Sequence, residues 1–226
     1  IHGTVCSIPE RLLREVYGLP FQAAIAEENL RGVMPCYCSI GGEPVSASEH
    51  LLTQILRQEM GFDGVAVADY SAVSNVHHTQ KLYETEAEAG LACLSAGMDV
   101  ELPDTVCFNE EMKAMFAQGK ADMALLDQAV RRVLRAKFRM GLFEHPFALT
   151  GSALSEMVHH PEDELITLQS ALESLVLLKN DNHVLPVGKN VRKIALIGPH
   201  ADNARHFFGG YTHLSMVEAI HAVMNS

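Results

Sequence analysis

Two runs of strand-forming residues on either side of one helical segment constrain the fold of this chain most strongly. The first run covers residues 32–37, and the second covers residues 61–69 and ends on Asp69. Between them, apolar residues recur at helical intervals up to Gly61. A strand, a helix and a strand in immediate succession imply parallel strands joined by a right-handed crossover, so this pattern predicts an α/β fold.

Asp69 marks the point where the second run stops being apolar. Val65, Val67 and their small neighbours suit a strand that is buried on both faces, which would place the Asp69 carboxylate at the carboxyl end of that strand. In β/α barrels this end of the strands carries the chemistry. An aspartate after a strand can also cap the next helix, and the spacing alone leaves both interpretations open.

Periodicity and turn residues predict the remaining elements. Before Asp69 they are a helix that starts at a capping box in residues 7–10 and is interrupted at Pro20, a loop at residues 41–42, and a helix that starts at a capping box in residues 46–49 and ends at Gly61. After Asp69 we expect a polar loop from residue 70 through His78, a helix at residues 84–96, and a strand at residues 97–103 that carries Asp99 and Glu101. The last elements are a helix at residues 122–140, a helix with a buried face from Pro161 onward, and a buried strand at residues 193–199.

The helix expected at residues 122–140 combines an apolar stripe with a cluster of basic residues. The stripe includes Leu126, Val130 and Phe138, and the Arg and Lys residues lie between residues 131 and 139, where cations suit the helix dipole. We interpret the basic cluster as a solvated face opposite a buried stripe, in preference to an anion-binding site.

The periodic patterns fade at residues 144–160, where Pro, Gly, Ser and His dominate, as is typical of a connection between domains. We therefore expect one domain in residues 1–143 and the opening of a second α/β domain in residues 161–226. One helix, one strand and a tail are too few for a doubly wound sheet, so only the start of that second domain is expected here.

Charge and hydropathy exclude several kinds of partner. The formal net charge of −11 arises from 28 acidic and 17 basic residues without a basic block, so we expect no nucleic acid partner. No apolar run approaches the roughly 20 residues that cross a bilayer, so no membrane partner is expected either.

The cysteines argue against a disulfide framework, because their number is odd and they are scattered at Cys6, Cys36, Cys38, Cys93 and Cys107. This usage favours a reducing compartment, with the cytoplasm ahead of other locations. Cys36 and Cys38 lack the second ligand pair of a structural zinc site, so they are interpreted as a buried thiol pair. The histidine doublets at residues 77–78 and 159–160 are interpreted as solvated loop residues. We predict neither a metal nor another cofactor.

Several motifs, taken together and in order, resemble glycoside hydrolase family 3, the exo-acting β-glucosidases and β-xylosidases that combine a (β/α)8 TIM-like barrel with an α/β sandwich domain. The motifs that carry this resemblance lie at residues 13–17, 33–37, 51–57, 61–70, 96–103, 137–143, 174–180 and 197–199. The resemblance implies that residues 1–143 are the C-terminal portion of the barrel and that residues 161–226 begin the sandwich.

The resemblance also implies roles for individual residues. Asp69 would be the catalytic nucleophile of a retaining exo-β-glycosidase, which forms a covalent glycosyl-enzyme that water opens. Tyr37 would orient Asp69 through its phenol, and Tyr70 and Tyr211 would be aromatic residues that clamp the aglycone or second sugar. Met98 would line the sugar pocket. Ordinary packing remains an alternative for Tyr37 and Met98.

The sequence departs from the family pattern at two neighbours of Asp69, because Ala68 replaces the usual Ser and Tyr70 the usual Trp. The early barrel strands and the acid/base glutamate of the family have no counterpart in this sequence. We therefore expect the barrel and sandwich to be completed by further sequence or by another chain, which includes a homo-oligomer. The expected substrates are oligosaccharides or aryl glycosides with a terminal β-D-glucosyl or β-D-xylosyl residue.

Two other functions stay open at this point. One is a carbohydrate-binding or assembly protein that kept the fold and lost catalysis. The other is a metal-dependent barrel hydrolase that uses Asp69, Asp99, Glu101 and a nearby histidine.

Overall fold

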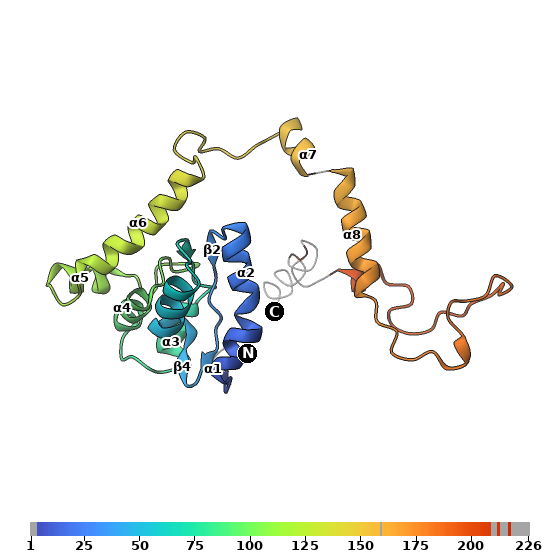
Figure 1. Cartoon of the computed structure of the whole chain (residues 1–226), viewed down its shortest axis with the longest axis horizontal. Coiled ribbons are helices and arrows are strands. Elements are labelled where there is room, and N and C mark those ends of the chain that lie inside the picture. Colours follow the sequence, from blue (N-terminus) through green and yellow to red (C-terminus); the bar gives the residue numbers. More distant parts are fainter. Residues whose placement is uncertain (1–3, 159, 209–211, 213–216, 218–226) are drawn as a thin grey trace. The chain divides into compact units, whose positions relative to one another are not determined.

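The computed structural model describes residues 4–158, 160–208, 212 and 217 (Figure 1). The chain divides into two compact units, residues 1–149 and residues 150–226. The first unit contains the strands and the longer run of helices, and the described part of the second contains two α-helices, two short 3₁₀-helices and irregular segments. Within the described residues, no helix is both long and apolar enough to cross a membrane.

Three consecutive parallel segments form the sheet that the strand–helix–strand pattern predicts. Strand β2 (Gly32–Val33) pairs in parallel with β5 (Val65–Ala66), and Val67 forms a parallel bridge with Val100. The assigned strands are shorter than the predicted runs, but the hydrogen bonding continues beyond them. The amide of Val67 donates to the Val33 carbonyl at 2.9 Å, and the amide of Ala68 donates to the Val100 carbonyl at 2.9 Å. Both edges of the segment that ends on Asp69 are therefore paired.

A second small sheet lies earlier in the chain. Strand β1 (Val5–Cys6) pairs in parallel with β3 (Ser39–Ile40), and β3 pairs antiparallel with β4 (Glu43–Pro44). The predicted loop at residues 41–42 is the hairpin turn between them. Both of its glycines have positive φ, at 62° and 90°, which other residues adopt with strain.

Helices cover the strands of the first unit. They are α1 (Glu10–Leu12), the π-helix η1 (Leu13–Tyr17), α2 (Leu19–Glu28), the 3₁₀-helix η2 (Val45–Ala47), the π-helix η3 (His50–Glu59), α3 (Ala72–His78), α4 (Glu86–Ala96), α5 (Glu110–Ala117) and α6 (Met123–Arg139). The predicted interruption of the first helix lies at Gly18, two residues before Pro20. Pro20 itself lies in the first turn of α2, where its missing N–H costs nothing.

Two predicted capping boxes are wrong in position. The first helix begins at Glu10 after Pro9 and has no side-chain cap, so Ser7 does not start it. Before η3 the hydroxyl of Ser48, and not that of Ser46, accepts a hydrogen bond of 3.2 Å from the Leu51 amide. Ser48 also donates to the Glu43 carboxylate at 2.6 Å, which fixes the start of η3 to the β3–β4 hairpin.

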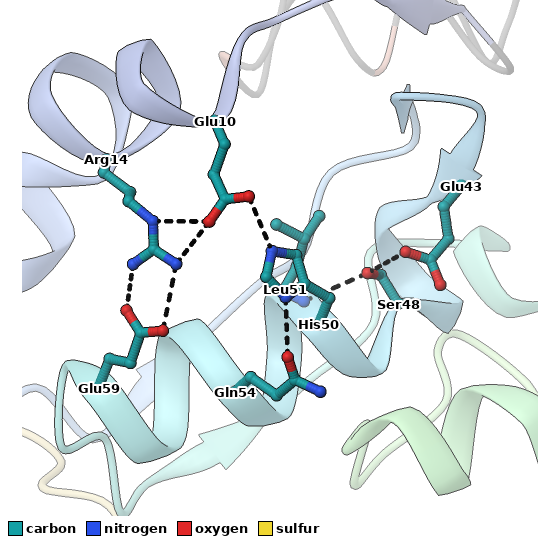
Figure 2. A network of polar contacts seen from close by, with 8 residues as sticks. All are labelled: Glu10, Arg14, Glu43, Ser48, His50, Leu51, Gln54 and Glu59. Carbon is teal, nitrogen blue, oxygen red and sulfur yellow. Dashed lines mark hydrogen bonds and ion pairs between the residues drawn. The ribbon is translucent and has the colours of Figure 1, made fainter.

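A polar network ties the N-terminal helices to η3 (Figure 2). Arg14 forms ion pairs with Glu10 at 2.6 Å and with Glu59. At the other end of η3, His50 Nδ1 lies 2.9 Å from the Gln54 side-chain oxygen, and His50 Nε2 lies 3.5 Å from Glu10. These contacts connect residues that are 45 positions apart in the sequence, as in the bond between Arg14 and Glu59.

The polar loop expected through His78 is wrong, because residues 72–78 form helix α3. Val73 and Val76 are fully buried and lie three residues apart, so they anchor one face of the helix in the core. The histidines at residues 77–78 occupy its last turn and are therefore not loop residues.

The predicted helix at residues 84–96 is confirmed as α4. Thr85 and Glu88 form a complete capping box at its start, and Gly97 ends it with a φ of 115°. The buried side chains of α4 pack into a core with η3, α3 and the strand ends. The members of this core are Leu52, Leu56, Phe62, Ala66, Ala68, Ala72, Val73, Val76, Ala89, Cys93, Ala96, Met98 and Cys107.

Helix α6 confirms the helix predicted at residues 122–140, but its basic face is partly buried at Arg132 and part of its apolar stripe is exposed, which differs from our prediction. Arg132 pairs with the buried Asp99, and Arg139 pairs with Asp63 at 2.7 Å, so part of the basic face binds the strand region. Val130 and Phe138 of the apolar stripe are 46% and 62% exposed. The ion pairs explain this arrangement, because a buried carboxylate requires a cationic partner.

The second unit departs from two predictions. Helix α8 (Pro161–Ser174) follows α7 (Ser152–Val158), and its expected buried face is exposed, as at Leu165 and Leu168. The strand predicted at residues 193–199 is not paired with another strand in the described part of the chain, and Ile197 is 91% exposed. A strand needs a partner for its backbone groups, and none of the described segments provides one here.

Candidate active site

Asp69 lies at the carboxyl end of the middle one of the three parallel segments, in the position that the sequence predicts. Its side chain is partly buried, between the fully buried Ala68 and the exposed Tyr70. No ion pair among the described residues involves Asp69. Its carboxylate therefore lies at the accessible carboxyl end of the parallel segments, without a cation among the described residues to neutralise it.

Local backbone geometry aims the Asp69 carboxylate. Its Oδ1 accepts a hydrogen bond of 2.7 Å from the amide of Tyr70, and its main-chain carbonyl accepts one of 2.9 Å from Ala72. Ser71 follows with a φ of 62°, an uncommon conformation for a residue other than glycine, and is the N-cap position of α3. Asp69 thus does not cap this helix, and the capping interpretation of its side chain is wrong.

Tyr37 contacts the same turn from the segment between β2 and β3. Its phenol donates a hydrogen bond of 2.8 Å to the main-chain carbonyl of Tyr70, which is the residue next to Asp69. The side chain of Gln80 donates to the Tyr37 carbonyl and to the Ser39 hydroxyl, both at 3.2 Å. Tyr37 therefore acts on the turn through the backbone. Gln80 supports Tyr37, and no sequence pattern predicted this role.

The other three predicted substrate-binding residues have different surroundings. Tyr70 is 64% exposed, so its ring is available for contact beside Asp69. Met98 is completely buried in the core and has no surface left to line a pocket, which supports the packing alternative. Tyr211 lies outside the described residues. The structure thus brings together Tyr37, Asp69 and Tyr70.

Asp99 is the centre of a buried ion-pair network behind the strands. Its carboxylate accepts from Arg57 at 2.7 Å, from Arg132 at 3.0 Å and from the Ala66 amide at 2.9 Å, and its side chain is fully buried. Burial lowers the pKa of Arg57, and Asp99 opposes that effect. Because Ala66 belongs to β5, this network fixes the strand that carries Asp69.

Glu101 is occupied by a different structural role. Its carboxylate accepts hydrogen bonds from the Cys107 amide at 2.9 and 3.0 Å and from the Phe108 amide at 2.8 Å. Burial raises the pKa of Glu101, while these amide donors oppose the shift. The amides hold its oxygens toward the loop before α5, so Glu101 is not placed as a proton donor to a ligand at Asp69.

These contacts remove the basis for a metal-dependent hydrolase. That alternative needs Asp69, Asp99 and Glu101 to converge with a histidine, yet Asp99 binds two arginines and Glu101 binds backbone amides. Within the part of the chain that the structure describes, no three His, Cys, Asp or Glu residues are grouped as metal ligands. The alternative fails because of what its carboxylates bind.

The cysteine pair differs from the buried pair that we predicted. Cys36 is exposed and Cys38 is partly buried, with their sulfur atoms 3.1 Å apart. The segment between β2 and β3 bends at residues 37–38, so the pair is not covered by a regular strand. All five cysteines are free thiols, which agrees with the absence of a disulfide framework.

Comparison with known proteins identifies the family. The sequence profile of the Glycosyl hydrolase family 3 N terminal domain matches residues 1–136, and that of the Glycosyl hydrolase family 3 C-terminal domain matches residues 175–226. The chain belongs to glycosyl hydrolase family 3, as the ordered motifs predicted.

Proteins similar to this chain include β-glucosidases and β-xylosidases. The chain is 34% identical to a lysosomal beta glucosidase of Dictyostelium discoideum, over 92% of this chain and 26% of the relative. It is 35% identical to a beta-xylosidase of Formosa agariphila, over 93% of this chain and 30% of the relative. The chain thus spans less than a third of the length of these relatives.

Solved structures of the same family have a similar fold. The crystal structure of a beta-glucosidase from Listeria innocua superimposes with a TM-score of 0.74 and 31% identity, over 84% of this chain and 26% of that one. Its family is of the TIM-barrel type, and the present chain shares the α/β class with it.

Proposed function

We propose that this chain is the nucleophile-bearing part of a retaining exo-β-glycosidase. Asp69 would attack the anomeric carbon of a terminal β-D-glucosyl or β-D-xylosyl residue and form a covalent ester with the sugar. Water would then open that ester on the same face, so the configuration is retained. The leaving group would be protonated by a glutamate of the complete enzyme that lies beyond this chain.

One observation carries this proposal: a carboxylate at the carboxyl end of a parallel strand that pairs with no cation of the described residues and is fixed by the turn that follows it. A nucleophile needs a charged oxygen that is held in one direction and is not neutralised by an ion pair. The Tyr70 amide holds the Asp69 carboxylate at 2.7 Å, and Tyr37 holds the Tyr70 carbonyl at 2.8 Å. The exposed ring of Tyr70 adds an aromatic face on which a sugar can stack.

The domain assignment is part of the proposal. Residues 1–143 would supply the C-terminal strands of the TIM-like barrel, residues 144–160 the linker, and residues 161–226 the start of the α/β sandwich. The three parallel segments support the first assignment, and the order of the two family profiles along the chain supports the last. In the complete enzyme, further strands would continue the sheet beyond β2 and beyond Val100.

The substrate class follows from the family and stays at the level of the terminal sugar. Relatives of this chain include both β-glucosidases and β-xylosidases. The Listeria innocua beta-glucosidase has been crystallised with glucose and with gluconolactone. A β-glucoside or β-xyloside, either an oligosaccharide or an aryl glycoside, is therefore the substrate that we propose.

The test is the substitution Asp69→Asn in the complete polypeptide that contains this chain. Loss of the nucleophile should lower kcat for an aryl β-glucoside by about a thousandfold or more, because no covalent intermediate can form. Asp127→Asn is a matched control, since Asp127 lies on the exposed surface of α6 and bonds only weakly to Arg131 at 3.9 Å. An Asp69→Asn enzyme that is as active as the control would refute the assignment of Asp69 as nucleophile, and sugar binding without hydrolysis by the unsubstituted protein would favour a carbohydrate-binding role.

A further inference from the structure

Three free thiols lie on or beside the segment that carries Tyr37, whose phenol contacts the turn at Asp69. Cys36 and Cys38 flank Tyr37 on the segment between β2 and β3, and their sulfur atoms are 3.1 Å apart. Cys6 belongs to β1, and burial together with the nearby thiol of Cys38 raises its pKa. None of these groups takes part in the proposed glycosidase chemistry.

The two thiols that flank Tyr37 differ in their exposure. Cys36 is exposed, so a small oxidant can reach its sulfur atom. Cys38 is partly buried, and burial followed by the neighbouring Cys36 thiol raises its pKa. This is the arrangement of an attacking and a resolving cysteine. The exposed thiol reacts first with the oxidant, and the second thiol stays protonated until it attacks the oxidised sulfur.

We propose that Cys36 and Cys38 are a redox-active dithiol, which hydroperoxides oxidise to a disulfide and small thiols reduce again. The Cys36 thiolate attacks one oxygen of hydrogen peroxide, breaks the O–O bond and becomes a sulfenic acid, while the other oxygen leaves as water after protonation. The Cys38 sulfur then attacks the Cys36 sulfur and expels a second water, which takes up the Cys38 proton. Two thiols and one peroxide thus give one disulfide and two waters.

The backbone favours this pair over a bond between Cys38 and Cys6. Cys6 is held in a parallel pairing with Ile40, and its carbonyl accepts a hydrogen bond of 3.1 Å from Gly41. The residues from Met34 to Cys38 belong to no strand, and the hydrogen bonds that their carbonyls accept from Val45 and Gln80 are not part of a strand ladder. A ring closed over one intervening residue is strained, and strained disulfides are easily reduced, which makes the change reversible.

Closure of this ring would act on the candidate site, a consequence that rests on the proposed function. Tyr37 is the one residue inside the ring, and its phenol holds the Tyr70 carbonyl at 2.8 Å. Bond formation shortens the distance between the two sulfur atoms from 3.1 Å to about 2 Å and fixes the torsion angle across the new bond, which rotates the backbone on each side of Tyr37. The phenol would then leave its place beside the turn that aims Asp69.

Peptide mapping of the complete protein tests the site without any assay of activity. After hydrogen peroxide treatment, the tryptic peptide of residues 32–57 contains both cysteines and should lose two hydrogen atoms. It should also stop reacting with iodoacetamide until dithiothreitol is added. Cys36→Ser and Cys38→Ser should abolish this change, and the control Cys6→Ser should preserve it.

Other mapping results would overturn the proposal. One such result is a disulfide that links the Cys6 peptide, which ends at Arg11, to the peptide of residues 32–57. It would show that Cys6, and not the neighbouring thiol, is the partner in the disulfide. Thiols that remain open to alkylation after peroxide, or that proceed to sulfonic acids without a disulfide, would show that the pair is no dithiol switch.

A second arm measures the effect on hydrolysis. The oxidised protein should lose about threefold to tenfold in kcat/KM, the effect of one lost hydrogen bond, and dithiothreitol should restore it. Cys36→Ser should make hydrolysis insensitive to peroxide. Unchanged hydrolysis in a protein with a mapped disulfide would refute the coupling to Tyr37. An active Asp69→Asn variant in the reduced state would refute the proposed function instead, so the two failures are distinguishable.

Discussion

At the scale of single residues, the candidate site depends on how one turn is held. Asp69 contacts the Tyr70 amide, the Tyr70 carbonyl accepts from Tyr37, and Ser71 adopts a φ of 62° before α3 begins. Each of these contacts restricts the backbone on which the carboxylate stands. The sequence predicted that Tyr37 and Asp69 would lie at neighbouring strand ends, but it could not show that a backbone carbonyl connects them.

Tyr37→Phe tests this connection at the level of one hydrogen bond. The variant keeps the ring and loses only the phenol, so kcat/KM should fall about threefold to tenfold. The thermal stability should change little, because the ring continues to fill its place. Tyr17→Phe, at a tyrosine that is 53% exposed on η1, is the matched control. Equal activity of the two variants would show that the bond to Tyr70 has no part in catalysis.

His50 gives the first unit a pH-dependent contribution to its stability. The hydrogen bond with Gln54, followed by the nearby charge of Glu10, raises the pKa of His50 in the folded state. The contribution is therefore complete below the pKa of the unfolded chain, about 6.5, and is lost as the pH rises through the folded pKa. The pKa of Glu10 is lowered, mainly by Arg14, so Glu10 stays ionised across this range.

The free energy of unfolding of His50→Gln, measured with urea, checks this sign. The wild type should exceed the variant by more at about pH 5.5 than at about pH 8.5. Glu10→Gln should reduce the dependence on pH, because it removes one of the groups that raise the pKa of His50. A larger difference at the higher pH would contradict the network in Figure 2.

At the scale of elements, buried charges fix the strand that ends on Asp69. Asp99 joins Arg57 of η3, Arg132 of α6 and the Ala66 amide of β5, with its own side chain fully out of contact with solvent. A side chain in this position cannot lose its partners without leaving a buried charge. The network is therefore a structural reason why η3 and α6 both pack near β5.

Replacement of Asp99 should be far more destabilising than replacement of a surface aspartate that also binds arginine. Asp99→Ala should lower the free energy of unfolding by about 3–5 kcal/mol, since it leaves Arg57 buried and unpaired. Asp63→Ala should cost less than about 1 kcal/mol, because the Asp63 side chain is partly exposed and its ion pairs are screened. Urea unfolding measures the free energy of unfolding of both variants. Equal losses would refute the claim that the buried ion pairs of Asp99 stabilise the first unit more than the exposed ion pairs of Asp63.

The elements that sequence predicted well are those with clear start and stop signals. Helix α4 has a capping box at Thr85 and a glycine end, and η3 ends at Gly61 as expected. Helix α3 was missed because Ser, Asn and His favour helices weakly and only Val73 and Val76 mark its buried face. The contacts of the basic face of α6 were missed because Arg139 and Arg132 bind Asp63 and Asp99, and contacts so distant in sequence leave no periodic signal.

At the scale of the whole molecule, the family and the α/β class were predictable from the sequence. The pairing of strands and the burial of helix faces in the second unit were not. Ordered motifs identified glycosyl hydrolase family 3, and the two family profiles agree with it. The strand expected at residues 193–199 and the buried face of α8 depend on partner segments, which a local pattern does not reveal. Met98 was expected in a pocket and is buried, because a methionine at a strand end suits either environment.

The most direct test of the central claim is a mechanism-based label on the complete enzyme. A 2-deoxy-2-fluoro β-glucoside with a good leaving group slows both steps and lets the glycosyl-enzyme accumulate. Tryptic mapping should then place the sugar on the peptide of residues 58–81, and fragmentation should place it on Asp69. A label on any other residue, or turnover without a covalent intermediate, would contradict the assignment of Asp69 as nucleophile.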